Sequence, residues 1–144
     1  MRVLESVRRW GVLTLVLGAA LVACGGPLHY APKGTPRAPE ADATITADVN
    51  AASSITRLVI TTEHLAPPGR LQEGGSTYVV WARKADGAAW QRVGAIKYDE
   101  GSRKGELSEA SVPLTAFELI ISIEKQPAPD APSGDVVISQ KIGN

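Results

Sequence analysis

The sequence has 144 residues, of which 44% are hydrophobic, with 15 basic residues, 15 acidic residues and one cysteine. The zero net charge argues against a nucleic-acid-binding protein. A single cysteine excludes an internal disulfide framework and a cysteine-rich metal site within the chain. The length is that of about one domain, and the residue pattern divides it into three parts, residues 1–23, 24–42 and 43–144.

Residues 1–23 have the pattern of an export signal. Arg2, Arg8 and Arg9 give a basic start, and an uncharged, Leu- and Val-rich stretch follows over residues 10–23. As a helix this stretch spans about 21 Å, which is short of the ~30 Å hydrocarbon core of a bilayer. We therefore expect a cleaved signal peptide. The alternative is an uncleaved anchor over residues 10–23, against which the length argues.

The signal ends in Leu-Val-Ala-Cys-Gly, residues 21–25, which resembles a bacterial lipobox. The resemblance implies diacylglycerol on the Cys24 sulfur and cleavage before Cys24. Two or three acyl chains hold a protein firmly, because each buried methylene contributes ~0.8 kcal/mol. We expect a protein in the bacterial cell envelope, anchored in the membrane through Cys24 and facing the periplasm or the cell surface. Gly25 in place of Asp favours the outer membrane. The alternative is that Cys24 is a small buried residue.

Residues 24–42 are expected to be the lipidated cysteine and a flexible tether. Pro27, Pro32, Pro36 and Pro39 alternate there with small and polar residues. Prolines cannot donate to a strand ladder, and apolar residues are few. The sequence predicts a disordered, partly polyproline-like spacer that reaches up to ~50 Å.

Residues 43–144 show a hydrophobic period of two, which is typical of strands. Turn signals such as Ala-Asp-Gly at residues 85–87 separate the runs. We expect seven strands, over residues 44–49, 55–62, 76–84, 90–98, 106–112, 117–124 and 135–142. Seven short strands in ~100 residues predict an all-β, seven-stranded antiparallel immunoglobulin-like β-sandwich.

Ten apolar residues are expected to form the core between the two sheets of this sandwich. Trp81 lies in the third strand, where such sandwiches often bury a tryptophan. Burying its ring contributes ~5 kcal/mol before losses. The expected core residues are Leu58, Ile60, Val79, Trp81, Val93, Leu107, Leu119, Ile121, Val136 and Ile138.

The second half of the chain carries three short motifs, Tyr-Val-Val-Trp-Ala at 78–82, Leu-Ile-Ile-Ser-Ile-Glu at 119–124 and Ala-Pro-Ser-Gly-Asp-Val-Val at 131–137. Together they resemble the extracytoplasmic domain of anti-sigma-K-type factors. The resemblance covers roughly the last 70 residues, with Gly94 between the first two motifs, and it implies a β-sandwich outside the cytoplasm. The sigma-binding helices of that family have no counterpart here, so no sigma-factor inhibition is inferred.

Catalytic patterns are sparse in residues 43–144. His64 is the only histidine there, and a Gly-x-Ser-x-Gly elbow is missing. Glu63 and His64 fit a surface pair at a strand end better than a catalytic pair. We therefore expect no enzyme, no cofactor and no metal.

Three aromatic residues are the binding candidates. Trp90 begins a hairpin arm and fits either the core or, if exposed, an interface anchor. Tyr78 and Tyr98 alternate with core positions and are candidates for a cross-strand patch. We expect a lipid-anchored envelope module that acts in protein interaction or as a structural part, with an envelope protein as partner. The alternative is a lipoprotein that binds a small ligand or a glycan, and an enzyme fits the sequence least.

Overall fold

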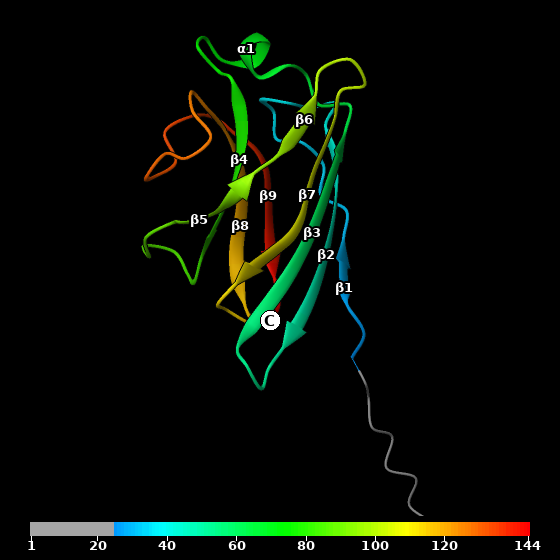
Figure 1. The fold of residues 1–144 in the computed structure, drawn as a ribbon, viewed down its shortest axis with the longest axis vertical. Helices are drawn as coiled ribbons and strands as arrows, with labels where there is room; N and C mark the ends of the chain where they lie inside the picture. Colours follow the sequence, from blue (N-terminus) through cyan, green and yellow to red (C-terminus); the bar gives the residue numbers. More distant parts are fainter. Residues whose placement is uncertain (1–24) are drawn as a thin grey trace, which may run out of the picture.

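The computed structural model describes residues 25–144, which form nine β-strands and one short helix (Figure 1). The predicted all-β class is confirmed. Two strands more than the expected seven are present, β1 before the first expected strand and β6 at the end of the fourth. The elements are β1 (Leu28–Tyr30), β2 (Asp42–Asn50), β3 (Ile55–Glu63), α1 (Pro68–Leu71), β4 (Thr77–Arg83), β5 (Gln91–Ala95), β6 (Lys97–Asp99), β7 (Lys104–Val112), β8 (Phe117–Glu124) and β9 (Val136–Ile142).

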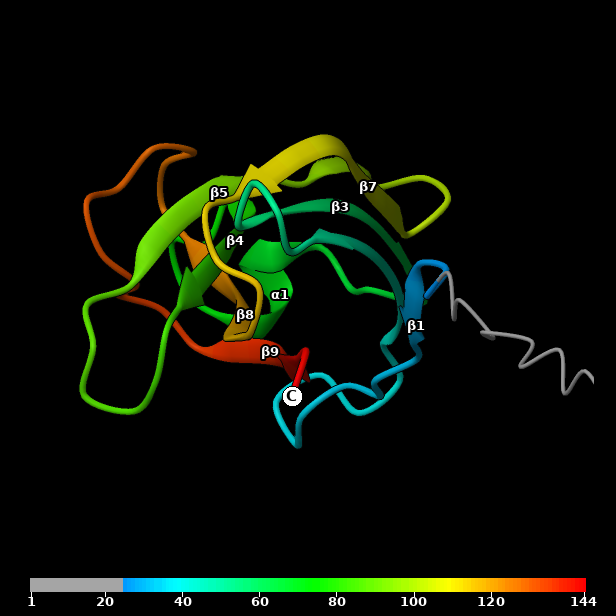
Figure 2. The ribbon, with the colours of Figure 1, turned by 90° about the horizontal axis from the view of Figure 1, so that it is seen from below.

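The strands form two antiparallel sheets that share one buried cluster. The five-stranded sheet has the order β1-β2-β3-β7-β6, and the four-stranded sheet has the order β5-β4-β8-β9. Figure 2 looks along the strands and shows the sheets facing each other. Strand β3 alternates strictly between exposed and buried residues, so that Leu58 and Ile60 reach the cluster together with Leu119 and Ile121 of β8. One apolar face per strand therefore builds the interior.

The predicted strand over residues 90–98 is divided between the two sheets. Strand β5 pairs with β4, whereas β6 pairs with β7 in the other sheet. The chain passes from one sheet to the other at the buried Ile96, whose N–H donates to the carbonyl oxygen of Tyr78 at 2.8 Å. The crossing chain closes one side of the domain.

The opposite side is closed by residues 31–41, which we call the strap. The Thr35 N–H and hydroxyl donate to the carbonyl oxygens of Val137 and Val136, at 2.9 and 2.7 Å, on the outer edge of β9. Ala38 and Ala41 of the strap are buried in the shared cluster. The strap thus covers an edge that would otherwise leave backbone groups of β9 open.

The expectation of a flexible tether over residues 24–42 is corrected for Leu28 to Asp42, which are part of the fold. Leu28–Tyr30 pair with β2 as strand β1, and the strap packs between the two sheets. Pro36 and Pro39 occupy its turns, where a missing N–H costs nothing. The strap has no bulky apolar side chains, which is why the sequence suggested disorder. Small buried residues and hydrogen bonds to β9 hold it in the fold instead.

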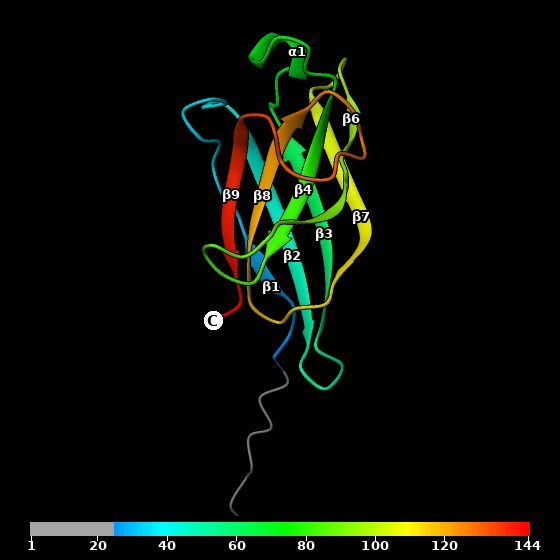
Figure 3. The ribbon, with the colours of Figure 1, turned by 90° about the vertical axis from the view of Figure 1, so that its left-hand side faces the viewer.

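Trp81 is buried as predicted, but on the other face of its sheet. Tyr78, Val80 and Ala82 point into the shared cluster, and Val79 and Trp81 therefore point outward. They form a second cluster with Ile120, so the expected single core that included Val79, Trp81 and Val136 is corrected. Figure 3 shows the loops over residues 84–90 and 125–135 crossing in front of this outer face. These loops exclude water from Trp81, whose exposure is 0%.

Candidate functional site

The predicted lipidation site, Cys24, lies outside the described residues. Gly25 directly follows it, and strand β1 begins at Leu28. Because β1 is antiparallel to β2 and Leu28 is level with Ala47, the described chain begins at the same end of the domain as the β2–β3 hairpin tip. Figure 1 places this end at the bottom and α1 at the top.

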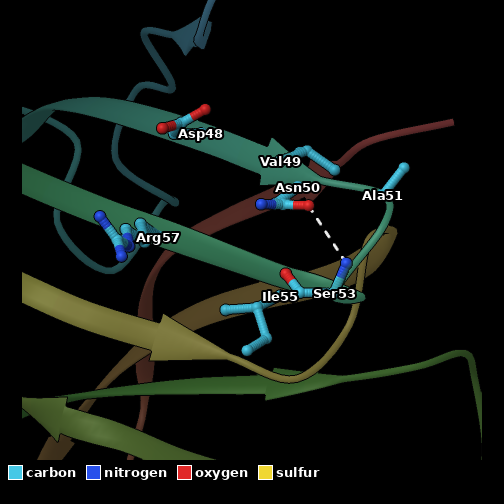
Figure 4. A pocket seen from close by; sticks show the side chains of 7 residues that line it. All are labelled: Asp48, Val49, Asn50, Ala51, Ser53, Ile55 and Arg57. Carbon is cyan, nitrogen blue, oxygen red and sulfur yellow. Dashed lines mark hydrogen bonds between the residues drawn. The ribbon is translucent and has the colours of Figure 1, made fainter.

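A shallow depression of about 400 Å³ lies beside the β2–β3 hairpin (Figure 4). Its lining is polar and small, with Asp48 and Arg57 on neighbouring strands and Ile55 at the start of β3. The Asn50 side-chain oxygen accepts a hydrogen bond from the Ser53 N–H at 3.1 Å and holds the turn. No sequence pattern singles out this hairpin, because nothing local distinguishes it from an ordinary turn.

The α1 end of the domain is built from loops with charged side chains. The Asp42 carboxylate accepts from Lys33 Nζ at 2.5 Å and lies 3.1 Å from His64 Nδ1. The hydrogen bond from Lys33, followed by that from His64, holds the pKa of Asp42 below its usual value. Arg103 and Glu40 form a looser pair at 3.6 Å.

Two residues at the α1 end adopt a left-handed backbone. His64 has φ of 54° and Arg103 has φ of 57°, a conformation that costs of order 1 kcal/mol or more for a residue with a side chain. The Leu65 N–H donates to the carbonyl oxygen of Arg103 at 3.0 Å and joins the two turns. The predicted surface location of His64 agrees with its exposed ring. Its carboxylate partner is Asp42, 22 residues away, rather than the adjacent Glu63.

Tyr78 and Tyr98 do not form the cross-strand patch considered for them, because they lie on strands of different sheets. Tyr78 is fully buried and Tyr98 is half-buried, and their rings meet edge to face with centroids 5.4 Å apart. The Tyr78 hydroxyl donates to the carbonyl oxygen of Ala66, and the Tyr98 hydroxyl donates to that of Leu65 at 2.5 Å. Burial raises the pKa of both phenols. The pair therefore fastens the loop after β3 to the core.

Trp90 is neither a fully buried core residue nor a fully exposed interface anchor, the two alternatives considered for it. It is half-buried and packs against the outer cluster of Val79, Trp81 and Ile120. The Arg83 guanidinium lies over its ring, 4.4 Å from the centroid, and also donates to Glu118 at 2.6 Å. A cation over an indole ring is an attractive arrangement, and here it fixes the ring against the sheet.

A buried hydrogen-bond network connects the sequence motifs of the second half. Trp81 Nε1 donates to Ser122 Oγ at 2.9 Å, and Ser122 Oγ donates to Glu124 Oε1 at 2.8 Å. The Glu124 carboxylate also accepts from the Ser133 N–H and hydroxyl, at 2.9 and 2.5 Å. A Cβ on Gly134 would lie 1.6 Å from the Ile123 carbonyl oxygen, so the close approach of this loop to β8 requires glycine. The network joins the loop to the sheet.

The Glu124 side chain is 1% exposed. Burial alone raises its pKa, but hydrogen bonds from Ser133, Ser122 and the Gly134 N–H outweigh burial and hold the pKa below its ordinary value. A carboxyl whose pKa is lowered on folding stabilises the protein above its unfolded pKa. That stabilisation is lost as the pH falls through the lower, folded value.

We therefore expect the Glu124→Gln variant to be less stable than the parent at pH 7, with the difference shrinking as the pH falls below about 4.5. Glutamine keeps the volume and removes the charge. Urea unfolding of both proteins between pH 7 and pH 3 measures the difference. A Glu100→Gln variant, altered on an exposed turn, is the control and should follow the parent. A constant difference between parent and Glu124→Gln across this range would contradict the assignment.

No metal centre or membrane-spanning helix is found between Gly25 and Asn144. No three His, Cys, Asp or Glu side chains of this range gather as metal ligands. None of its helices is long and apolar enough to cross a bilayer.

Comparison of the chain with protein-family models, with curated proteins and with solved structures gave no match.

Proposed function

We propose that this chain is a bacterial lipoprotein, held at an envelope membrane by acyl chains on Cys24, whose domain acts in protein interaction or as a structural part of the envelope. The observation that carries the proposal is the lipobox-like sequence at residues 21–25 directly before a folded domain. The first strand begins at Leu28, four residues after Cys24.

We also propose that the two sheets form an immunoglobulin-like β-sandwich. The buried cluster shared by both sheets and the antiparallel pairing throughout support this assignment. The outward position of Trp81 is a departure from the usual arrangement, in which the tryptophan packs between the sheets. The resemblance to the outer domain of anti-sigma-K-type factors remains part of this proposal, and its three motifs meet around Glu124.

The loops at the α1 end are the surface that we propose for a partner protein. They lie at the opposite end from the start of the described chain, and an anchor at Cys24 leaves them facing away from the membrane (Figure 1). Binding residues often lie on loops held by a rigid scaffold. Here the tyrosine pair and the left-handed turns at His64 and Arg103 fix the loop positions.

The Cys24→Ser variant tests the anchor. Without the thiol there is no acceptor for diacylglycerol, so we expect the variant to leave the membrane fraction or to keep its signal peptide. Membrane fractionation and mass spectrometry of the parent and the variant measure both outcomes. A variant that fractionates and migrates like the parent would show that the anchor is not at Cys24.

A photo-cross-linking residue in the anchored protein tests the partner surface in cells that produce this protein. Placed at Glu100, on the α1 end, it is expected to give a discrete adduct with another envelope protein. Placed at Ser111, on the exposed face of β7 near the other end, it serves as the control. Equal adducts from both positions would contradict the choice of surface.

A further inference from the structure

We infer that the end of the domain carrying the β2–β3 hairpin lies against the lipid headgroups, with the hairpin tip, residues 50–55, at their level. The inference rests on the proposed acylation of Cys24 and adds to it a surface and an orientation. The partner is the phospholipid surface of the membrane in which the acyl chains are buried.

The length of chain between the anchor and the domain limits how far the domain stands from the membrane. Four residue steps connect Cys24 to Leu28, and an extended chain covers at most ~14 Å over that length. The ~50 Å spacer expected from the sequence is not present, because the strap and β1 belong to the fold. The domain is therefore held within a few residues' length of the bilayer.

The hairpin tip extends about as far toward the membrane as the anchor can reach. Leu28 pairs with Ala47, and β2 continues for three more residues to Asn50. At 3.3–3.4 Å per residue this part of β2 extends ~10 Å beyond Leu28, and the turn extends further. The headgroup layer is about 5–7 Å thick on each side of the hydrocarbon core. A cysteine linked to glycerol lies within this layer, so the tip meets it as well.

The chemistry of this end fits a phospholipid surface. The turn between β2 and β3 consists of small, uncharged residues, two alanines and two serines. Leu28 and Ile55 are both 39% exposed, and they are two of the three large hydrophobic side chains that are exposed in residues 25–144. Both lie at the end where the chain begins. Apolar side chains at this depth gain by partial burial in the interface.

The charges beside the hairpin also suit this location. Arg57 faces solvent from β3 and forms no ion pair with another described residue, and Asp48 lies opposite it on β2. An arginine matches phosphate geometry well. The nearby acidic group keeps the local charge balanced, which fits a zwitterionic lipid. The α1 end, by contrast, carries many charged groups, among them Lys33, Glu40, Asp42, Glu100 and Arg103.

Fluorescence quenching in vesicles tests the orientation with the mature, acylated protein. Acylation removes the only native thiol, so that Ser53→Cys and Ser102→Cys each provide a single labelling site. Ser53 lies in the hairpin turn, and Ser102 lies in the exposed turn at the α1 end. Each variant is labelled with an environment-sensitive fluorophore and placed in phosphatidylcholine and phosphatidylethanolamine vesicles with a spin label on the lipid headgroup.

We expect the label at Ser53 to show blue-shifted emission and at least twofold quenching by the spin-labelled lipid, and the label at Ser102 to show neither. Equal and weak quenching of both labels on acylated, vesicle-bound protein would overturn the orientation and leave the anchor in place. Strong quenching at Ser102 alone would invert the orientation and overturn the inference. A parent protein whose Cys24 still reacts with the dye would overturn both the anchor and the inference.

Discussion

Replacing Trp81 with alanine is expected to lower the free energy of unfolding by about 3–5 kcal/mol, the range seen when a buried aromatic side chain is truncated. The ring is fully buried in the outer cluster, and its Nε1 donates to Ser122. The substitution leaves a cavity and removes a donor from the network around Glu124. For a domain of this size the melting temperature should fall by more than 10 °C.

Trp90 provides a matched control for Trp81, because both rings pack in the same cluster. Trp90 is half-buried, so the Trp90→Ala variant should lose clearly less stability than Trp81→Ala. Thermal unfolding followed by circular dichroism measures both variants. Equal losses at the two positions, or a Trp81→Ala protein that melts within a few degrees of the parent, would contradict the assigned packing.

Removing residues 25–41 is expected to destabilise the domain by about 3 kcal/mol or more, which is a large fraction of the stability of an ordinary domain. The deletion takes away β1, the buried alanines of the strap and the hydrogen bonds of Thr35 to β9. It also opens the outer edge of β9. A chain that begins at Asp42 should therefore melt at a lower temperature and associate through this edge.

A chain that begins at Leu28 is the control for this deletion. It lacks residues 25–27, which precede β1, and it should unfold like the chain that begins at Gly25. Calorimetry measures the stability of the three chains, and light scattering measures their association. If the chain that begins at Asp42 is as stable and as monomeric as the other two, then residues 25–41 act only as a spacer.

The alternation of polar and apolar residues along the chain was sufficient to place most strands. The range expected at residues 55–62 agrees with β3 to within one residue, because polar and apolar side chains alternate there without exception. Strand β4 lacks this guide. Residues 78–82 are apolar on both faces, so the sequence could not show which face carries Trp81. The loops that cover the outer face come from distant parts of the chain.

The strap and the candidate site depend on contacts that no local pattern reveals. Thr35 finds its acceptors 101 and 102 residues away, and Ala38 and Ala41 are too small to indicate burial. The pairing of His64 with Asp42 likewise appears only when β2 and β3 are aligned. For Tyr78 the period of two was correct, but the face was not, because Tyr78 points into the shared cluster and Val79 and Trp81 point outward. The hydroxyls of Tyr78 and Tyr98 find backbone acceptors inside the fold.

Strand β1 and the strap link the earliest and latest parts of the described chain. The Gly143 N–H donates to the Tyr30 hydroxyl at 3.0 Å, across 113 residues, and Thr35 reaches the first residues of β9. In a polypeptide that crosses a membrane with its amino terminus first, these contacts cannot form until the last strand has emerged. Contacts of such large sequence separation slow folding. Closure of the strap is therefore expected to be a late step in the folding of the domain.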